Sequence, residues 1–160
     1  SDLTKFQEGI VNMITNIITH KAEETIKLGE RLASILPDGI TLALTGDLGA
    51  GKTTLVRGIA QGLGIEDVVQ SPTFNIMKIY LKGNKPLIHI DAYRLENVNT
   101  DIGLDEYIGY ETGITVIEWP NYIAKLLPPY LMAVDIRNLG GENRSFTFSG
   151  REEVVQKIAL

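Results

Sequence analysis

The most constraining feature of this 160-residue chain is an eight-residue stretch from Gly46 to Thr53, which reads Gly-Asp-Leu-Gly-Ala-Gly-Lys-Thr. It matches the pattern G-x-x-x-x-G-K-[ST] at every fixed position. Glycines let such a loop curl until its backbone N–H groups point at phosphate oxygens, beside a lysine and a hydroxyl. The pattern needs a strand before it and a helix after it, so it predicts a strand–loop–helix unit.

The residues on both sides of this loop meet that requirement. Residues 40–45 are apolar and partly β-branched and follow the turn-forming residues 37–39, which predicts a buried strand. Apolar residues recur at helical spacing over 52–63, and Gly64 ends that helix. An ordinary turn with chance glycines explains this context less well.

The rest of the chain alternates between strand-like and helix-like segments around the loop. This alternation predicts an α/β, P-loop NTPase-like three-layer fold with a central mixed sheet. Further strands are expected over 14–19, 74–81, 86–90 with a continuation into 91–95, 114–117, 130–137 and 144–148. Further helices are expected over 22–36, 100–107, 121–127 and 151–160.

Length and composition narrow the class of protein. We assign residues 13–160 to a single domain, and we treat residues 1–12, which precede Met13, as either a natural extension or residues added to the natural protein. No apolar run approaches the roughly 20 residues of a membrane span. With no secretory pattern and no cysteine, the chain is expected to be cytoplasmic. The net charge of −5 indicates that any nucleic acid is held by a partner.

Two apolar runs end in an acid, one at Asp91 and one at Glu118. A nucleotide hydrolase needs a carboxylate for Mg²⁺ or its water, and a group that orients the attacking water. Ligands in open α/β sheets bind at the carboxyl ends of strands, so both acids are candidates for these two roles. The residue types leave open which acid takes which role, and the alternative is that both are solvated strand-end residues.

Two loops add weaker signals. Thr73 follows Pro72 in the segment after the helix, where its hydroxyl is a candidate sensor of the γ-phosphate, although an ordinary turn explains it about as well. Residues 84–87 read Asn-Lys-Pro-Leu, and Leu87 stands where a guanine-specific N-K-x-D motif has its acid. This difference favours ATP over GTP.

Taken together, these segments resemble the TsaE (YjeE) family of bacterial P-loop ATPases, which serve tRNA threonylcarbamoyladenosine biosynthesis. The resemblance covers about residues 18–148 and rests on residues 46–54, 71–74, 89–95 and 117–119. It implies binding of ATP with Mg²⁺, and slow hydrolysis in complex with the partners TsaB and TsaD. TsaD transfers the threonylcarbamoyl group to adenosine 37 of tRNAs reading ANN codons, so tRNA is met indirectly, through the complex.

The resemblance also implies roles for single residues. Lys52 would bind the phosphates, Thr53 and Glu118 would hold Mg²⁺, and Asp91 would lie near the γ-phosphate as a base or water positioner. Trp119 would lie near the nucleotide, and Thr73 would belong to a switch-like loop. The remaining nucleotide-binding residues would be Asp47, Leu48, Gly49, Ala50, Gly51 and Thr54.

Two other classes of function compete with this one. A P-loop small-molecule kinase has a similar size, but such kinases usually carry an arginine-bearing lid, and the six arginines here form no cluster in a long polar loop. A nucleotide-sensing module that hydrolyses nothing by itself is the other, and Asp91 and Glu118 favour hydrolysis over it.

Overall fold

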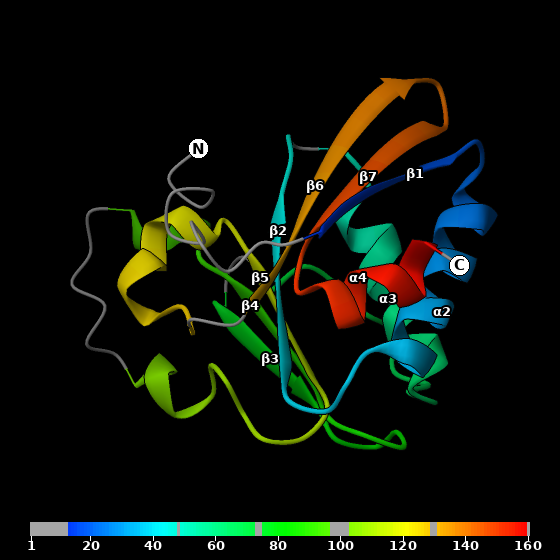
Figure 1. Cartoon of the computed structure of the whole chain (residues 1–160). Helices are drawn as coiled ribbons and strands as arrows, with labels where there is room; N and C mark the ends of the chain where they lie inside the picture. The colour runs from blue at the N-terminus through cyan, green and yellow to red at the C-terminus, as the bar shows by residue number, and fades with distance from the viewer. Residues whose placement is uncertain (1–12, 48, 73–74, 97–102, 129–130, 160) are drawn as a thin grey trace.

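The computed structural model describes residues 13–47, 49–72, 75–96, 103–128 and 131–159, and a seven-stranded mixed sheet forms its centre (Figure 1). The strands lie in the order β1-β7-β6-β2-β5-β4-β3. Their bounds are β1 Met13–Thr19, β2 Ile40–Thr45, β3 Met77–Tyr80, β4 Leu87–Asp91, β5 Ile114–Glu118, β6 Leu131–Gly140 and β7 Asn143–Gly150.

The four inner strands β6, β2, β5 and β4 run parallel, and antiparallel strands border them on both sides. Such inner strands are covered on both faces, and every residue of β4 and β5 is buried. Parallel strands end at the same edge of a sheet, so the segments that follow β2, β4 and β5 meet there. The predicted mixed sheet is confirmed, with β3 paired antiparallel to β4 and β7 paired antiparallel to β6.

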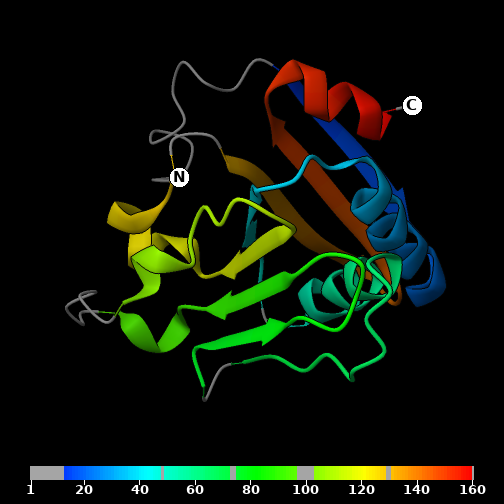
Figure 2. The ribbon, with the colours of Figure 1, turned by 90° about the horizontal axis from the view of Figure 1, so that it is seen from below.

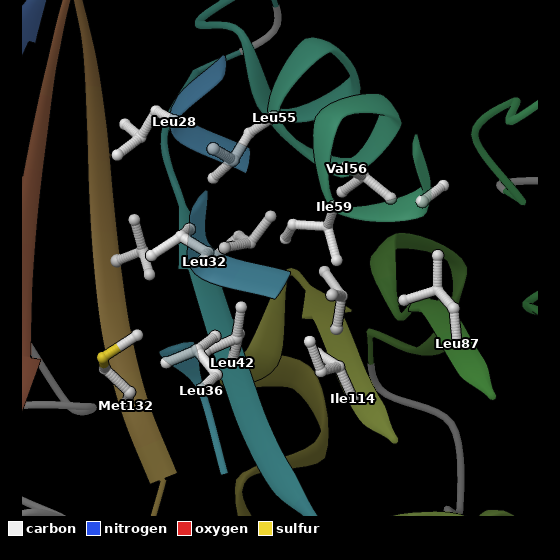
Figure 3. Close-up of a cluster of buried hydrophobic side chains, with 14 of the residues drawn as sticks. Leu28, Leu32, Leu36, Leu42, Leu55, Val56, Ile59, Leu87, Ile114 and Met132 are labelled. Carbon is white, nitrogen blue, oxygen red and sulfur yellow. The ribbon is translucent and has the colours of Figure 1, made fainter. Parts of the chain in front are cut away.

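The three α-helices of the described chain lie together on one face of the sheet (Figure 1). They are α2 Ala22–Ile35, α3 Lys52–Gly62 and α4 Glu152–Ala159. Figure 2 shows α4 beside the edge strand β1, which it contacts. Leucines and isoleucines from α2 and α3 fill the space above the sheet, as the close-up in Figure 3 shows for Leu32, Leu55 and Ile59, all fully buried.

Glycines allow α2 and α3 to approach each other closely. A Cβ atom built on Gly58 would lie 2.3 Å from the Ile26 carbonyl oxygen, and one on Gly29 would lie 2.5 Å from the Leu55 carbonyl oxygen. Either distance is too short for any side chain. This close contact fixes the position of α3, which begins at Lys52, against α2.

The opposite face of the sheet is covered by short 3-10 helices, so the layer on this face is thinner than the layer of α-helices. They span Tyr93–Leu95, Leu104–Glu106 and Pro120–Leu126. A second apolar core lies beneath them, in which Ile90 and Ile117 of the sheet pack with Ile123.

Two predicted strand bounds were wrong. The strand expected to continue through residues 91–95 ends at Asp91, because the Asp91 carboxylate accepts a hydrogen bond from the Tyr93 backbone N–H and turns the chain into a 3-10 helix. The strand expected over 74–81 is only Met77–Tyr80, preceded by Ile76 in the left-handed region at a φ of 66°. No helix in the described ranges is long and apolar enough to cross a membrane.

Candidate nucleotide site

The loop from Gly46 to Thr53 joins β2 to α3, as its motif predicts. Gly46 has a φ of 145°, and a Cβ atom there would lie 2.5 Å from the Ile136 carbonyl oxygen, so this position requires glycine. Gly51 precedes the helix in the left-handed conformation. No side chain caps the amino end of α3, and its first turn holds no acid. The N–H groups there suit an anion.

Lys52 lies at the start of α3 with its side chain folded over the loop. Its Nζ donates a hydrogen bond of 2.8 Å to the Gly46 carbonyl oxygen and lies 4.6 Å from the centre of the Trp119 ring. The side chain is buried, so its positive charge acts where water screens it little. It is placed to meet phosphate oxygens at the loop.

Trp119 belongs to an aromatic cluster with Tyr93 and Tyr122 at the edge of the loop. Trp119 stacks on Tyr122 with a 7° angle between the rings, and its backbone is in the left-handed region at a φ of 56°. A bulky residue rarely adopts this conformation, and strained positions of this kind gather at functional sites. Desolvation, with the nearby Glu96 carboxylate, raises the pKa of Tyr122 above its ordinary value of 10.0, so this ring stays neutral.

Asp91 and Glu118 are direct neighbours across the parallel strands β4 and β5, at the ends of both strands. Both are buried, and each is held by hydrogen bonds. Asp91 accepts from the Ser71 hydroxyl at 3.2 Å and from the Tyr93 N–H at 3.0 Å. Both acids therefore lie at the same edge of the sheet, at the carboxyl ends of their strands.

A cavity of about 560 Å³ brings most of the predicted residues together. This volume lies in the range of small-molecule pockets. The predicted residues that line it are Gly49, Gly51, Lys52, Thr53, Thr54, Asp91, Glu118 and Trp119. Asp47 and Ala50 instead line a neighbouring cavity that shares Lys52 and Trp119 with the first. Leu48, Thr73 and residues 1–12 lie outside the described residues.

Two side chains in this cavity carry oxygen atoms of the kind that bind a magnesium ion. Thr53 supplies a hydroxyl and Glu118 a carboxylate, and both line the cavity. Within the described ranges no three acids, histidines or cysteines gather into a metal site of their own. At nucleotide sites Mg²⁺ is usually held by one or two protein groups together with phosphates and water.

Several residues of the site were missed by sequence reasoning. Arg144 of β7 lines the cavity and donates from Nη2 to the Gly49 carbonyl oxygen at 3.3 Å, while its Nη1 binds the Gly141 carbonyl oxygen at 2.7 Å. His89 lies behind Glu118, with its Nε2 2.6 Å from Glu118 Oε2. A histidine two residues before Asp91 was the available signal for His89. Arg144 carries no such signal, because it lies 95 positions after Gly49, whose carbonyl oxygen it contacts.

Residues 84–87 lie at the other edge of the sheet, because Leu87 starts β4 and Asp91 ends it. The segment in which a guanine-reading motif was sought therefore does not line the cavity around the loop.

Comparison with known proteins gives one consistent result. A family model described as "Threonylcarbamoyl adenosine biosynthesis protein TsaE" matches residues 19–146. The chain is 43% identical over 131 residues to the tRNA threonylcarbamoyladenosine biosynthesis protein TsaE of Bacillus subtilis, covering 82% of each chain. It is 39% identical to the protein of the same name from Treponema pallidum, covering 81% of this chain and 96% of that one. A crystal structure titled as YdiB of Bacillus subtilis superposes with a TM-score of 0.79 at 34% identity, over 94% of this chain and 96% of that chain.

Proposed function

The chain belongs to the TsaE family of threonylcarbamoyl adenosine biosynthesis proteins, and from this premise we propose that it is the ATPase subunit of that pathway. In this proposal it hydrolyses ATP with Mg²⁺ in complex with TsaB and TsaD. The hydrolysis supports threonylcarbamoyl transfer to adenosine 37 of tRNAs reading ANN codons. The acidic chain meets tRNA only through that complex, which is consistent with its net charge of −5.

The observation that carries the proposal is the convergence of four groups on one cavity. Lys52 and Thr53 come from the loop, and Asp91 and Glu118 come from two adjacent parallel strands. Phosphoryl transfer is catalysed mainly by positioning and by charge, so a cation, a metal-binding pair and a water-orienting acid are the parts it requires.

Each group has a distinct task in this proposal. The loop N–H groups and Lys52 bind the phosphates, and Arg144 adds a second positive charge beside the loop. Thr53 and Glu118 hold Mg²⁺, which when bound neutralises charge on the β- and γ-phosphates. Asp91 orients the attacking water or accepts its proton, because Ser71 and the Tyr93 N–H fix the direction of its carboxylate.

An assay of ATP turnover with purified TsaB and TsaD, with and without tRNA, tests this proposal. We expect turnover to rise when the partners are added. A parallel panel of small metabolites tests the kinase alternative. Phosphate transferred to a metabolite, with no stimulation by the partners, would overturn the proposal in favour of a kinase. ATP binding without turnover under any condition would favour a sensing module.

A further inference from the structure

His89 is buried beneath the cavity, and the roles proposed above give it no task. Its side chain is fully buried on β4, two residues before Asp91, so it cannot touch a ligand in the cavity. Its ring makes one polar contact, from Nε2 to Glu118 Oε2 at 2.6 Å. The other ring nitrogen, Nδ1, is buried and has no hydrogen-bond partner among the described residues.

The unpartnered Nδ1 indicates what the ring contributes. A buried polar atom without a partner costs free energy, so packing alone favours an apolar side chain at this position. Its register partner on β5 is Val116, and the apolar residues Leu87 and Val116 belong to the core on this face. The ring is therefore explained by its contact with Glu118 rather than by packing.

The direction of this hydrogen bond follows from the role of Glu118. A carboxylate that binds Mg²⁺ is ionised and can only accept, so the proton lies on His89 Nε2 whether the ring is neutral or charged. Glu118 Oε2 is then occupied, and Glu118 Oε1 has no hydrogen-bond partner among the described residues.

We propose that His89 is a positioning residue for Glu118, holding one carboxylate oxygen so that the other is directed at the metal. This inference rests on the proposed function, because it requires Glu118 to be a magnesium ligand. Partners behind a metal ligand fix its orientation, and their loss typically lowers metal affinity about 10- to 100-fold. Without the ring, the Glu118 carboxylate would turn within its buried site.

The test measures how strongly Mg²⁺ tightens the binding of a non-hydrolysable ATP analogue. Calorimetric titration gives the dissociation constant of the analogue in chelator and in saturating Mg²⁺. The constant in chelator divided by the constant in Mg²⁺ measures the coupling between metal and nucleotide. In H89L, which lacks a donor, we expect this ratio to fall about tenfold or more while affinity in chelator stays unchanged. A merely structural role would weaken both affinities together.

Two amide variants test whether the position of the hydrogen-bond donor matters, as distinct from the loss of the ring. They also provide the test if H89L does not fold. The amide of H89Q reaches the position of Nε2, whereas the amide of H89N is one methylene shorter. We expect H89Q to keep the coupling within about threefold of the unmodified protein and H89N to lose it as H89L does. Equal coupling in H89N and H89Q, or unchanged coupling in H89L, would overturn the inference.

A variant of Glu118 itself distinguishes failure of this inference from failure of the proposed function. E118Q should lose the coupling, since an amide is a poor magnesium ligand. If E118Q keeps full coupling, the proposed metal role of Glu118 is wrong. If E118Q loses coupling and H89L does not, only the inference about His89 is wrong.

Discussion

At the scale of single residues, the site depends on a few buried polar atoms that are each held by a named partner. Lys52 is held by the Gly46 carbonyl oxygen, and Asp91 by Ser71 and the Tyr93 N–H. Charges in such a setting act more strongly than they would at the surface, because little water screens them. Single substitutions should therefore separate binding from hydrolysis.

Replacing Lys52 with alanine should weaken ATP binding. The variant loses a charge-assisted hydrogen bond to phosphate, which predicts a loss of about 10- to 100-fold in affinity. Calorimetric titration with ATP and Mg²⁺ measures it. Lys85→Ala is the matched control, because Lys85 is half-exposed and forms an ion pair with Asp38 outside the cavity. Equal losses in the two variants would contradict the role of Lys52.

Replacing each acid in turn should assign the two roles. Asp91→Ala should leave ATP affinity near its original value and lower turnover about 100-fold or more, as expected when a water-orienting base is lost. Glu118→Ala should weaken only the binding that depends on Mg²⁺. Titrations with and without Mg²⁺, together with phosphate release, test both variants. If Asp91→Ala abolished ATP binding and Glu118→Ala did not, the two roles would be exchanged.

At the scale of elements, the site is built from segments that meet at one edge of the sheet. The ends of β4 and β5 supply the acids, the start of α3 supplies Lys52 and Thr53, and the hairpin of β6 and β7 supplies Arg144. The position of α3 depends on its close contact with α2 through glycines. Changes at that contact should act on stability.

Gly58→Ala should destabilise the protein although alanine favours helices. A Cβ atom would lie 2.3 Å from the Ile26 carbonyl oxygen, which belongs to the backbone of α2 and cannot move freely. Overpacking of this kind costs about 1–3 kcal/mol, against about 1 kcal/mol of gained helix propensity. Urea unfolding measures the difference, with the exposed Gln61→Ala on the same helix as control. An unchanged or higher midpoint for Gly58→Ala would show that the helices separate easily.

Asp38 links three loops at the edge of the sheet away from the cavity. Its carboxylate pairs with Lys85 at 3.1 Å and accepts the Gly113 N–H at 3.1 Å, and these contacts lower the pKa of Asp38 below its ordinary value of 3.8. A lowered folded-state pKa means that this stabilisation is present above pH 3.8 and is lost as the pH falls through the folded-state value.

Asp38→Asn should therefore reduce stability at neutral pH more than at acid pH. The expected difference is small, because Asp38 and Lys85 are both about half exposed. Urea unfolding at pH 7 and near pH 3 measures it. An equal loss of stability at both pH values would show that the contribution is not ionic.

At the scale of the whole molecule, one sheet separates two apolar cores and presents the cavity at the edge where its parallel strands end. Open α/β sheets place ligands at this edge, because helix starts and strand ends converge there. Ligand binding should accordingly stabilise the entire fold rather than one loop.

ATP with Mg²⁺ should raise the melting temperature. At about 100 times its dissociation constant a ligand adds about 2.7 kcal/mol, which corresponds to about 5–10 °C for a chain of this size. GTP should stabilise less, because the proposed ligand is ATP and residues 84–87 do not form a guanine-specific N-K-x-D motif. Thermal melts with each nucleotide test this, with a chelator as control. Equal shifts for ATP and GTP would contradict the preference for adenine.

Much of this architecture follows from local patterns. The strand over residues 40–45 was predicted residue for residue and the helix after the loop to within one residue, because glycines and a turn mark their ends. The continuation of a strand through residues 91–95 was predicted wrongly, since the Asp91 carboxylate captures the Tyr93 N–H instead. Residues 82–85 give no periodic signal but mark a turn, and the strands β3 and β4 on either side of them pair antiparallel.

The amino-acid sequence by itself determined the phosphate-binding loop, the two acids and their place at strand ends, since each depends on neighbours within a few positions. Only the tertiary structure decided that Asp91 and Glu118 pair across β4 and β5, that His89 lies behind Glu118, and that Arg144 reaches the loop. These contacts join residues 27 to 95 positions apart. Strand order and register create them, and neither is encoded in a local pattern.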